Sequence, residues 1–143
     1  MIDNRPILLA EDDQIDQKSV KRAFNDVKIV NSLVIVENGQ EALHYLKDSC
    51  KEYPCLILLD LNMPVMNGIE FLHVIKADDE LKIIPVVVLT TSKEDQDRVE
   101  SYKLSVAGYM LKPVNYQDFV EVIRAIDLYW TLSAPHPLRR NIK

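Results

Sequence analysis

Four short, continuous runs of apolar residues recur along the chain, and a weaker fifth run follows them. They cover residues 7–10, 33–36, 56–59 and 86–89, with the weaker run at 108–111. Within these runs the apolar residues do not alternate with polar ones, which is typical of strands buried on both faces of a parallel sheet. We therefore expect five strands in one largely buried sheet.

Segments with helical periodicity separate these runs. The residues predicted to share the buried face of each helix are Ile15, Ala23, Phe24 and Val27; Ala42, Leu43 and Leu46; Phe71, Leu72 and Ile75; and Phe119, Val122, Ile123, Ile126 and Trp130. Strand and helix alternate along the whole chain, which predicts right-handed crossovers between parallel strands. The predicted fold class is therefore α/β, a doubly wound five-stranded parallel sheet with helices on both faces.

Two of the expected helices begin with N-cap signals. Ser92 is followed three residues later by Asp95, which is close to a capping box, and Asn115 precedes Asp118 at the same spacing. In both cases the side-chain oxygen can accept a hydrogen bond from a backbone N–H of the first turn, and the carboxylate favours the positive end of the helix. We expect helices to begin directly after Ser92 and Asn115.

Length, composition and charge limit the classes of protein. The 143 residues include 17 Lys and Arg against 22 Asp and Glu, and the net charge of −5 argues against binding to nucleic acid. With 3 Gly in the chain, a glycine-rich nucleotide-binding loop is disfavoured. No apolar run is long enough to span a membrane and no signal peptide is visible, so we expect a cytoplasmic protein. We expect one domain over residues 1–130 and a tail over 131–143, too short for a second domain.

Polar residues gather where the predicted strands end. They are Glu11, Asp12 and Asp13 after the first strand, Asp60 after the third, Thr90 after the fourth and Lys112 after the fifth. Each one alone is most simply a solvated residue at the start of a loop. The carboxyl ends of parallel strands nevertheless meet at one edge of the sheet, where ligands bind. The four strand ends together therefore predict a functional site at this edge.

The residue types at these positions suggest phosphoryl chemistry. Carboxylates crowded into one crevice repel one another, and their hard oxygen atoms suit Mg²⁺, which leaves room for phosphate oxygens. With Glu11 and Asp12 engaged by the ion, Asp60 could attack a phosphoryl group and form an aspartyl phosphate. Lys112 would neutralise the phosphoryl oxygens, and the Thr90 hydroxyl would donate a hydrogen bond to one of them.

Four motifs in the chain resemble the receiver domain of two-component response regulators. They are Ala10-Glu11-Asp12-Asp13, Leu59-Asp60-Leu61-Asn62-Met63-Pro64-Val65-Met66-Asn67-Gly68, Leu89-Thr90-Thr91-Ser92 and Leu111-Lys112-Pro113. All four occur in the order found in that family, and the match is closest to CheY-like regulators that carry no output domain. The resemblance implies a flavodoxin-like fold with strand order 2-1-3-4-5.

The resemblance also implies a chemical role for several residues. Asp60 would be the phosphoacceptor, receiving a phosphoryl group from a sensor histidine kinase or a histidine phosphotransfer domain. Glu11, Asp12 and Asp60 would hold Mg²⁺ together with the backbone carbonyl of Asn62. Lys112 would pair with a phosphoryl oxygen. The protein would catalyse its own phosphorylation and dephosphorylation and would not otherwise be an enzyme.

A switch is implied as well. Thr90 would bond a phosphoryl oxygen, and Tyr109 would change rotamer as Thr90 moves. The helix after Ser92, the strand at 108–111 and the helix after Asn115 would form the face that binds a downstream protein or a second copy of the chain. No direct contact with nucleic acid or membrane is expected.

Two details refine the resemblance. The acidic pair Glu11-Asp12 replaces the commoner Asp-Asp, and the longer glutamate could reach the ion through water. The stretch 84–92 and the Tyr129-Trp130 pair are similar to regulators that work with bacterial phytochrome kinases. These stretches favour a phytochrome-associated subgroup.

Two alternatives are left open by the sequence. The first is a phosphatase with an aspartyl nucleophile, similar to the haloacid dehalogenase group, but that group has a second Asp where this chain has Asn62. The second is a binding module that keeps the fold without being phosphorylated. The intact set of Asp12, Asp60, Thr90 and Lys112 argues against it.

Overall fold

Five parallel strands form the centre of the molecule. The structure, a computed structural model, describes residues 4–112 and 115–132, with side chains up to residue 129. The strands are β1 (Ile7–Ala10), β2 (Leu33–Val36), β3 (Leu56–Asp60), β4 (Val86–Thr90) and β5 (Gly108–Leu111). They lie in the order β2-β1-β3-β4-β5, and every neighbouring pair is parallel. The predicted fold class and strand order are confirmed.

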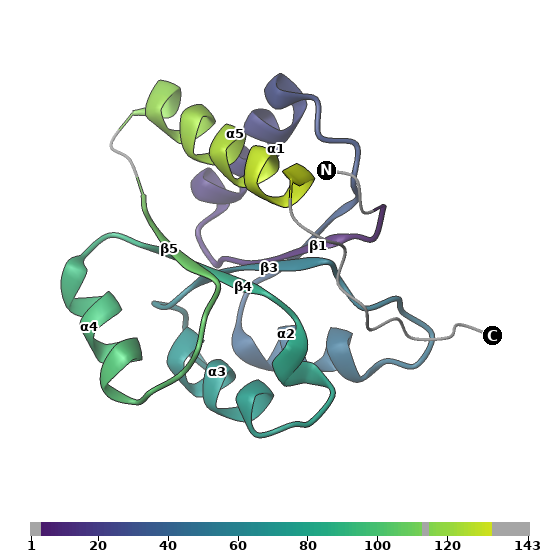
Figure 1. Cartoon of the computed structure of the whole chain (residues 1–143), viewed down its shortest axis with the longest axis vertical. Coiled ribbons are helices and arrows are strands. Elements are labelled where there is room, and N and C mark those ends of the chain that lie inside the picture. The colour runs from purple at the N-terminus through teal and green to yellow at the C-terminus, as the bar shows by residue number, and fades with distance from the viewer. Residues whose placement is uncertain (1–3, 113–114, 133–143) are drawn as a thin grey trace.

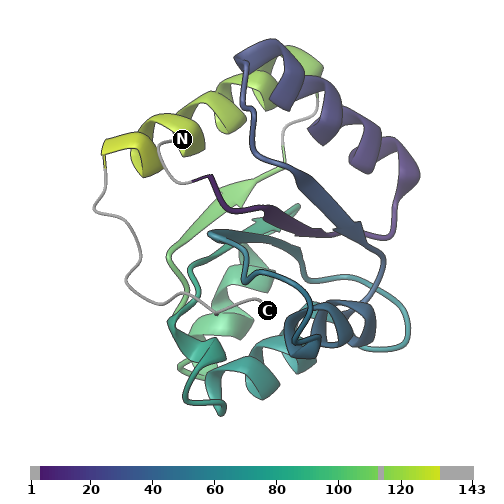
Figure 2. The same cartoon turned by 90° about the vertical axis from the view of Figure 1, so that its right-hand side faces the viewer.

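Helices cover both faces of this sheet. They are α1 (Gln14–Val27), α2 (Gly39–Lys47), α3 (Gly68–Lys76), the short 3₁₀ helix η1 (Leu81–Ile83), α4 (Lys93–Ser101) and α5 (Tyr116–Leu132). Helices α1 and α5 lie together on one face, and α2, α3 and α4 lie on the other (Figures 1 and 2). A strand buried between two helical layers needs apolar side chains at every position.

Successive residues of the inner strands enter two separate cores. In β1, Leu8 and Ala10 pack on the side of α2 and α3, whereas Ile7 and Leu9 pack on the side of α1 and α5. This alternation follows from the two-residue period of a strand, and it explains why the apolar runs are continuous. The edge strands β2 and β5 are less completely buried than the three inner strands.

One residue expected on the buried face of α1 lies outside it. Ile15 is 75% exposed, whereas Val20, Ala23 and Phe24 are buried. Ile15 precedes Val20 by five residues, which places it about 140° away around the helix. The residue that does share the face of Val20 is Asp16, four positions before it, and this acid points toward the functional edge of the sheet.

The predicted N-caps form, with one difference. The Asp118 backbone N–H donates to Asn115 Oδ1 at 2.9 Å, and the Asp95 backbone N–H donates to Ser92 Oγ at 3.3 Å. In a complete capping box the Asp95 carboxylate would accept from the Ser92 backbone N–H. That N–H instead donates to Thr90 Oγ1 at 3.2 Å, and the carboxylate is turned toward Thr90.

The expected tail and two other features fall partly outside the described residues. Helix α5 continues to Leu132, past the boundary expected at residue 130. Outside the described residues lie positions 133–143 of the expected tail, Pro113 and the side chain of Trp130. Among the helices that are described, none has the length and apolar character needed to cross a lipid bilayer.

Candidate functional site

The register of the sheet brings four strand ends to one edge. Ala10 of β1 lies opposite Leu59 of β3, so the residues that follow them, Glu11 and Asp60, are level with each other. At the other side of β4, Thr90 lies opposite Leu111. The next residue, Lys112, donates its backbone N–H to the Thr90 carbonyl at 2.7 Å. Residues far apart in the sequence therefore meet at the predicted edge.

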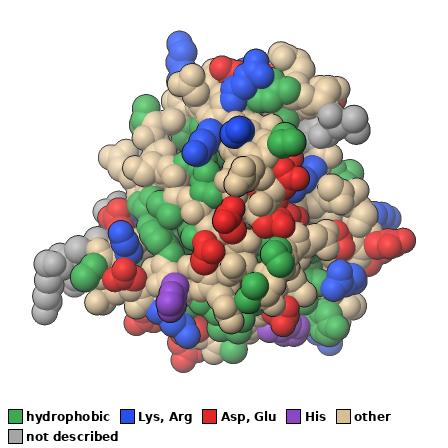
Figure 3. All heavy atoms as spheres, turned by 180° about the vertical axis from the view of Figure 1, so that it is seen from behind, with side chains coloured by type: hydrophobic (Ala, Val, Ile, Leu, Met, Phe, Trp, Pro, Cys, Tyr) green, Lys and Arg blue, Asp and Glu red, His purple; other side chains and the backbone are tan. Residues whose placement is uncertain are grey.

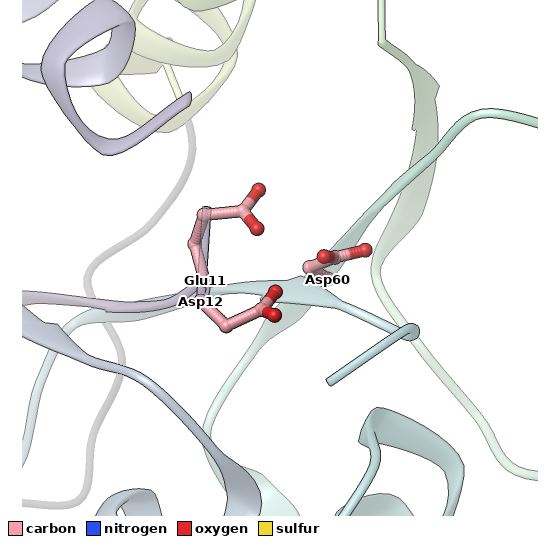
Figure 4. A group of neighbouring side chains, drawn as sticks. All are labelled: Glu11, Asp12 and Asp60. Atoms are coloured by element: carbon pink, nitrogen blue, oxygen red, sulfur yellow. The ribbon is translucent and has the colours of Figure 1, made fainter. Parts of the chain in front are cut away.

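Three carboxylates share a small space at this edge. One carboxylate oxygen from each of Glu11, Asp12 and Asp60 lies within 4.8 Å of the other two. Glu11 and Asp12 extend from the end of β1 toward Asp60 at the end of β3 (Figure 4). Asp13 does not join them, because its Oδ1 accepts hydrogen bonds from the backbone N–H groups of Ile15 and Asp16 and so caps α1.

Lys112 is the cation that faces these carboxylates. Its Nζ forms an ion pair with Glu11 Oε1 and lies 3.0 Å from Asp16 Oδ2 and 3.6 Å from Asp60 Oδ2. Burial by itself lowers the pKa of Lys112, but the hydrogen bond and charge of Glu11, with Asp60 and Asp16, raise it above its ordinary value. The lysine therefore stays charged in the site.

Glu11 shows how strongly negative charge is crowded here. Its side chain is 2% exposed, and burial raises its pKa from 4.5 to about 8. The neighbouring Asp60 adds to this rise, while Lys112 opposes it. Figure 3 views the molecule from the side opposite to Figure 1, and acidic side chains gather near the middle of the face that it shows. A carboxylate that is costly to ionise beside other carboxylates marks a place where a further cation would be stabilising.

The donor set fits a divalent metal ion. All three converging ligands are carboxylate oxygens, which hard cations such as Mg²⁺, Mn²⁺ and Ca²⁺ prefer over nitrogen or sulfur ligands. Two positive charges would also stabilise the ionised form of Glu11, whose pKa is raised mainly by burial and further by Asp60. The site therefore supports a divalent ion held by acidic residues.

A close approach of two chain segments fixes the position of Asp60. The Gly68 N–H donates to the Leu61 carbonyl at 3.0 Å, and a Cβ at Gly68 would lie 2.6 Å from the Asp60 carbonyl oxygen. Only glycine allows the start of α3 to pack so closely against the end of β3. Asn62 adds a backbone N–H that donates to Asp60 Oδ1 at 3.3 Å.

Thr90 is buried, and its hydroxyl is already engaged. It donates toward the Ser92 carbonyl at 3.0 Å and toward Asp95 Oδ2 at 3.1 Å. The same Asp95 oxygen accepts from Asn62 Nδ2 at 3.2 Å. Tyr109, the other predicted switch residue, is half-buried on β5 and packs against the core that includes Val99 of α4.

Two residues of this site, Asp16 and Asp95, were not among those predicted from the sequence. Asp16 had a usable signal, since it lies four residues before Val20 and so on the sheet-facing side of α1. Asp95 had only its capping-box spacing after Ser92, and that pattern predicts a local bond rather than a bond to Thr90. Their roles depend on contacts between separate elements.

Comparisons with known proteins agree with this geometry. The sequence model of the response regulator receiver domain family matches residues 7–124. The chain is 40% identical over 136 residues to the response regulator Rcp1 of Synechocystis sp., covering 92% of each protein.

Two solved structures are also similar. One is the phosphorylated cyanobacterial phytochrome response regulator RcpA, with a TM-score of 0.83, 36% identity, and coverage of 94% of this chain and 99% of that one. The other is the Mn²⁺-bound form of Rcp1, with a TM-score of 0.82, 36% identity, and coverage of 95% and 100%. The predicted resemblance to phytochrome-associated regulators is confirmed, and this chain belongs to the response regulator receiver family of two-component signalling.

Proposed function

We propose that Asp60 is the residue that becomes phosphorylated, in a reaction that depends on Mg²⁺. The observation that carries this assignment is the position of Asp60. Its carboxylate lies within 4.8 Å of those of Glu11 and Asp12 and has Lys112 Nζ 3.6 Å from Oδ2. A carboxylate placed between a metal-binding acidic pair and a lysine can act as a nucleophile toward a phosphoryl group whose charge is neutralised from two sides.

The reaction transfers a phosphoryl group from an anionic phosphodonor to the Asp60 carboxylate, which is itself an anion. An Asp60 oxygen forms a bond to phosphorus as the bond from phosphorus to the donor breaks, and the electron pair of that bond leaves with the donor. Glu11, Asp12, Asp60 and the backbone carbonyl of Asn62 would hold Mg²⁺, and the bound ion would supply positive charge to the phosphoryl oxygens. Lys112 stabilises another phosphoryl oxygen, and the Thr90 hydroxyl donates to a third. Attack by water on the aspartyl phosphate reverses the modification.

The physiological phosphodonor is a phosphohistidine of a sensor histidine kinase or a phosphotransfer domain. Similarity to the cyanobacterial phytochrome response regulator RcpA supports a kinase of the phytochrome type. Because such a phosphohistidine is made from ATP, the exchange takes place in the cytoplasm. Apart from this self-modification, we propose no catalytic turnover of a separate substrate.

The output is a change in partner binding through the face of α4, β5 and α5. Leu111 of β5 and Leu128 and Tyr129 of α5 are exposed. Exposed apolar and aromatic side chains of this kind are suited to a protein partner or to a second copy of the chain. A full switch needs about 5.5 kcal/mol of differential stabilisation, and new bonds from the phosphoryl group to Thr90 and Lys112 contribute part of it.

Phosphorylation by a small donor tests the assignment. Incubation with acetyl phosphate and Mg²⁺ should add the mass of one phosphoryl group, and Asp60→Asn should abolish the addition. Asp13→Asn is a matched control, because Asp13 is a neighbouring acid that caps α1 and asparagine is an equally good N-cap. Phosphorylation that persists in Asp60→Asn would contradict the assignment.

Two further measurements address the metal and the alternatives. Chelation with EDTA should stop phosphorylation, and Asp12→Asn should weaken Mg²⁺ binding measured by calorimetry. Failure to bind Mg²⁺ would favour the unphosphorylated binding module. Repeated turnover of p-nitrophenyl phosphate would favour the phosphatase, although Asn62 stands where that group has its second acid.

A further inference from the structure

Asp95 joins three parts of the phosphorylation site through its carboxylate. Its Oδ2 accepts hydrogen bonds from Thr90 Oγ1 at 3.1 Å and from Asn62 Nδ2 at 3.2 Å, and its Oδ1 lies 3.4 Å from Arg98 Nη1. The residue is only 8% exposed. One oxygen atom of α4 therefore holds the end of β4 and the loop between β3 and α3 together.

This carboxylate is not occupied as a helix cap. Ser92 already caps α4 through its hydroxyl, and the Ser92 N–H, which a capping-box carboxylate would accept, donates to Thr90 Oγ1. The ion pair with Arg98 is weak, because the Arg98 side chain is 53% exposed. The main interactions of Asp95 are thus directed into the site.

The Thr90 hydroxyl cannot serve Asp95 and a phosphoryl group at once. A threonine hydroxyl has one proton to donate. In this structure the Thr90 oxygen lies 3.0 Å from Ser92 O and 3.1 Å from Asp95 Oδ2, so both acceptors share that proton. If Thr90 turns its proton to a phosphoryl oxygen, the Asp95 carboxylate loses the hydrogen bond that it accepts from Thr90.

We propose that Asp95 is a positioning residue that holds Thr90 in its unphosphorylated position and releases it when Asp60 carries a phosphoryl group. The bond opposes the switch and sets how readily the site responds. It also connects the site to α4, because Asp95 belongs to the first turn of that helix and loses its link to β4 when Thr90 turns away. This inference rests on the proposed phosphorylation of Asp60.

Beryllofluoride, a non-covalent mimic of the phosphoryl group, is a suitable probe with Mg²⁺ present. Without the Asp95 carboxylate, Thr90 gives up only its hydrogen bond to the Ser92 carbonyl, so Asp95→Ala should bind beryllofluoride about tenfold more tightly by calorimetry. Asp95→Asn keeps the size of the side chain and a weaker, neutral acceptor, so its beryllofluoride affinity should lie between those of wild type and Asp95→Ala. This variant also provides the test if the alanine variant does not fold. Glu94→Ala is the matched control, since Glu94 is an exposed acid in the same turn and its loss removes the same charge.

A double-mutant cycle shows whether Asp95 acts through Thr90. In a Thr90→Ala background the hydroxyl is absent, so adding Asp95→Ala should leave beryllofluoride affinity unchanged. The inference is overturned if Asp95→Ala binds no more tightly than wild type, if Glu94→Ala gives the same gain, or if the gain persists in Thr90→Ala.

The proposed function has its own separate failure. If wild-type protein does not bind beryllofluoride, or if Asp60→Asn binds it equally well, the assignment of Asp60 fails. Asp60-dependent binding that is indifferent to Asp95 overturns only the inference about Asp95.

Discussion

Lys112 Nζ lies 3.6 Å from Asp60 Oδ2 while forming its ion pair with Glu11 Oε1. The lysine is therefore shared between the proposed phosphoacceptor and a buried neighbour. A phosphoryl group on Asp60 would add negative charge on that side and draw the ammonium group toward it. The competition between Glu11 and Asp60 for one cation makes Lys112 sensitive to the state of the site.

Replacing Lys112 should separate phosphorylation from its consequences. In Lys112→Ala, Asp60 keeps its neighbours Glu11 and Asp12, so acetyl phosphate should still label the protein slowly. The bond between the lysine ammonium group and a phosphoryl oxygen is lost. Phosphorylation should then no longer change binding to a partner, or self-association, measured by light scattering. A normal binding response in this variant would contradict the role of the lysine.

The same variant should lose stability when metal is absent. Glu11 and Asp60 would be left together without their cation, and urea unfolding in EDTA should show a loss of about 2 kcal/mol. Lys82→Ala is the matched control, because Lys82 pairs with Asp79 on the exposed surface and should contribute less than about 1 kcal/mol. Equal losses in the two variants would contradict the buried character of the Lys112 pair.

The raised pKa of Glu11 predicts a pH dependence of stability in the metal-free protein. The unfolded chain releases the Glu11 proton near pH 4.5, but the folded protein retains it until about pH 8. The folded state thus binds more protons in this window, and the free energy of unfolding should fall as pH rises through it. Urea unfolding in EDTA measures this slope, and Glu11→Gln should flatten it between about pH 6 and 8. A slope unchanged by Glu11→Gln would contradict the prediction.

Gly68 should be intolerant of even a methyl group. A Cβ there would lie 2.6 Å from the Asp60 carbonyl and 2.7 Å from Leu61 Cα, so the backbone must shift at the proposed phosphoacceptor. We expect Gly68→Ala to destabilise the fold by about 1–3 kcal/mol and to slow labelling by acetyl phosphate. Gly108→Ala is the control, since a Cβ at Gly108 meets nothing within 4 Å. Normal labelling of a folded Gly68→Ala protein would show that this contact does not position Asp60.

The exposed residue Leu111 tests the proposed output face. It is 63% exposed at the end of β5, where a charge would be costly to bury in an interface. Leu111→Glu should weaken beryllofluoride-dependent self-association or partner binding about tenfold without preventing phosphorylation. Val30→Glu, at an 87% exposed site between α1 and β2, should have no such effect. Equal weakening by both variants would argue against the specific face.

Much of the fold could be predicted because its signals are local. Strands buried on both faces require continuous apolar runs, and the runs at 7–10 and 56–59 correspond to β1 and to most of β3. The error at Ile15 arose because an apolar residue in the first turn of a helix need not share the buried stripe. Its actual direction follows from the angle it makes with Val20.

The candidate site was predictable to the same extent. Residues at the carboxyl ends of parallel strands must meet at one edge, so the proximity of Glu11, Asp60, Thr90 and Lys112 follows from strand order and register. The role of Asp95 was not predictable, because its capping-box spacing suggested that it accepts from the Ser92 N–H. In the structure the Asp95 carboxylate instead accepts from the Thr90 hydroxyl, and the Ser92 N–H donates to Thr90 Oγ1.

The alternation of strands and helices, the polar residues at the strand ends and the family resemblance could all be derived from the sequence alone. These depend on side-chain periodicity and on residue types at fixed positions. The bonding partners of the polar groups follow from the packed fold: Lys112 lies against Glu11, Asp16 and Asp60, and Asp95 against Thr90 and Asn62. A buried donor or acceptor bonds to whichever group the packed elements bring within reach, and contacts between residues distant in the chain set that choice.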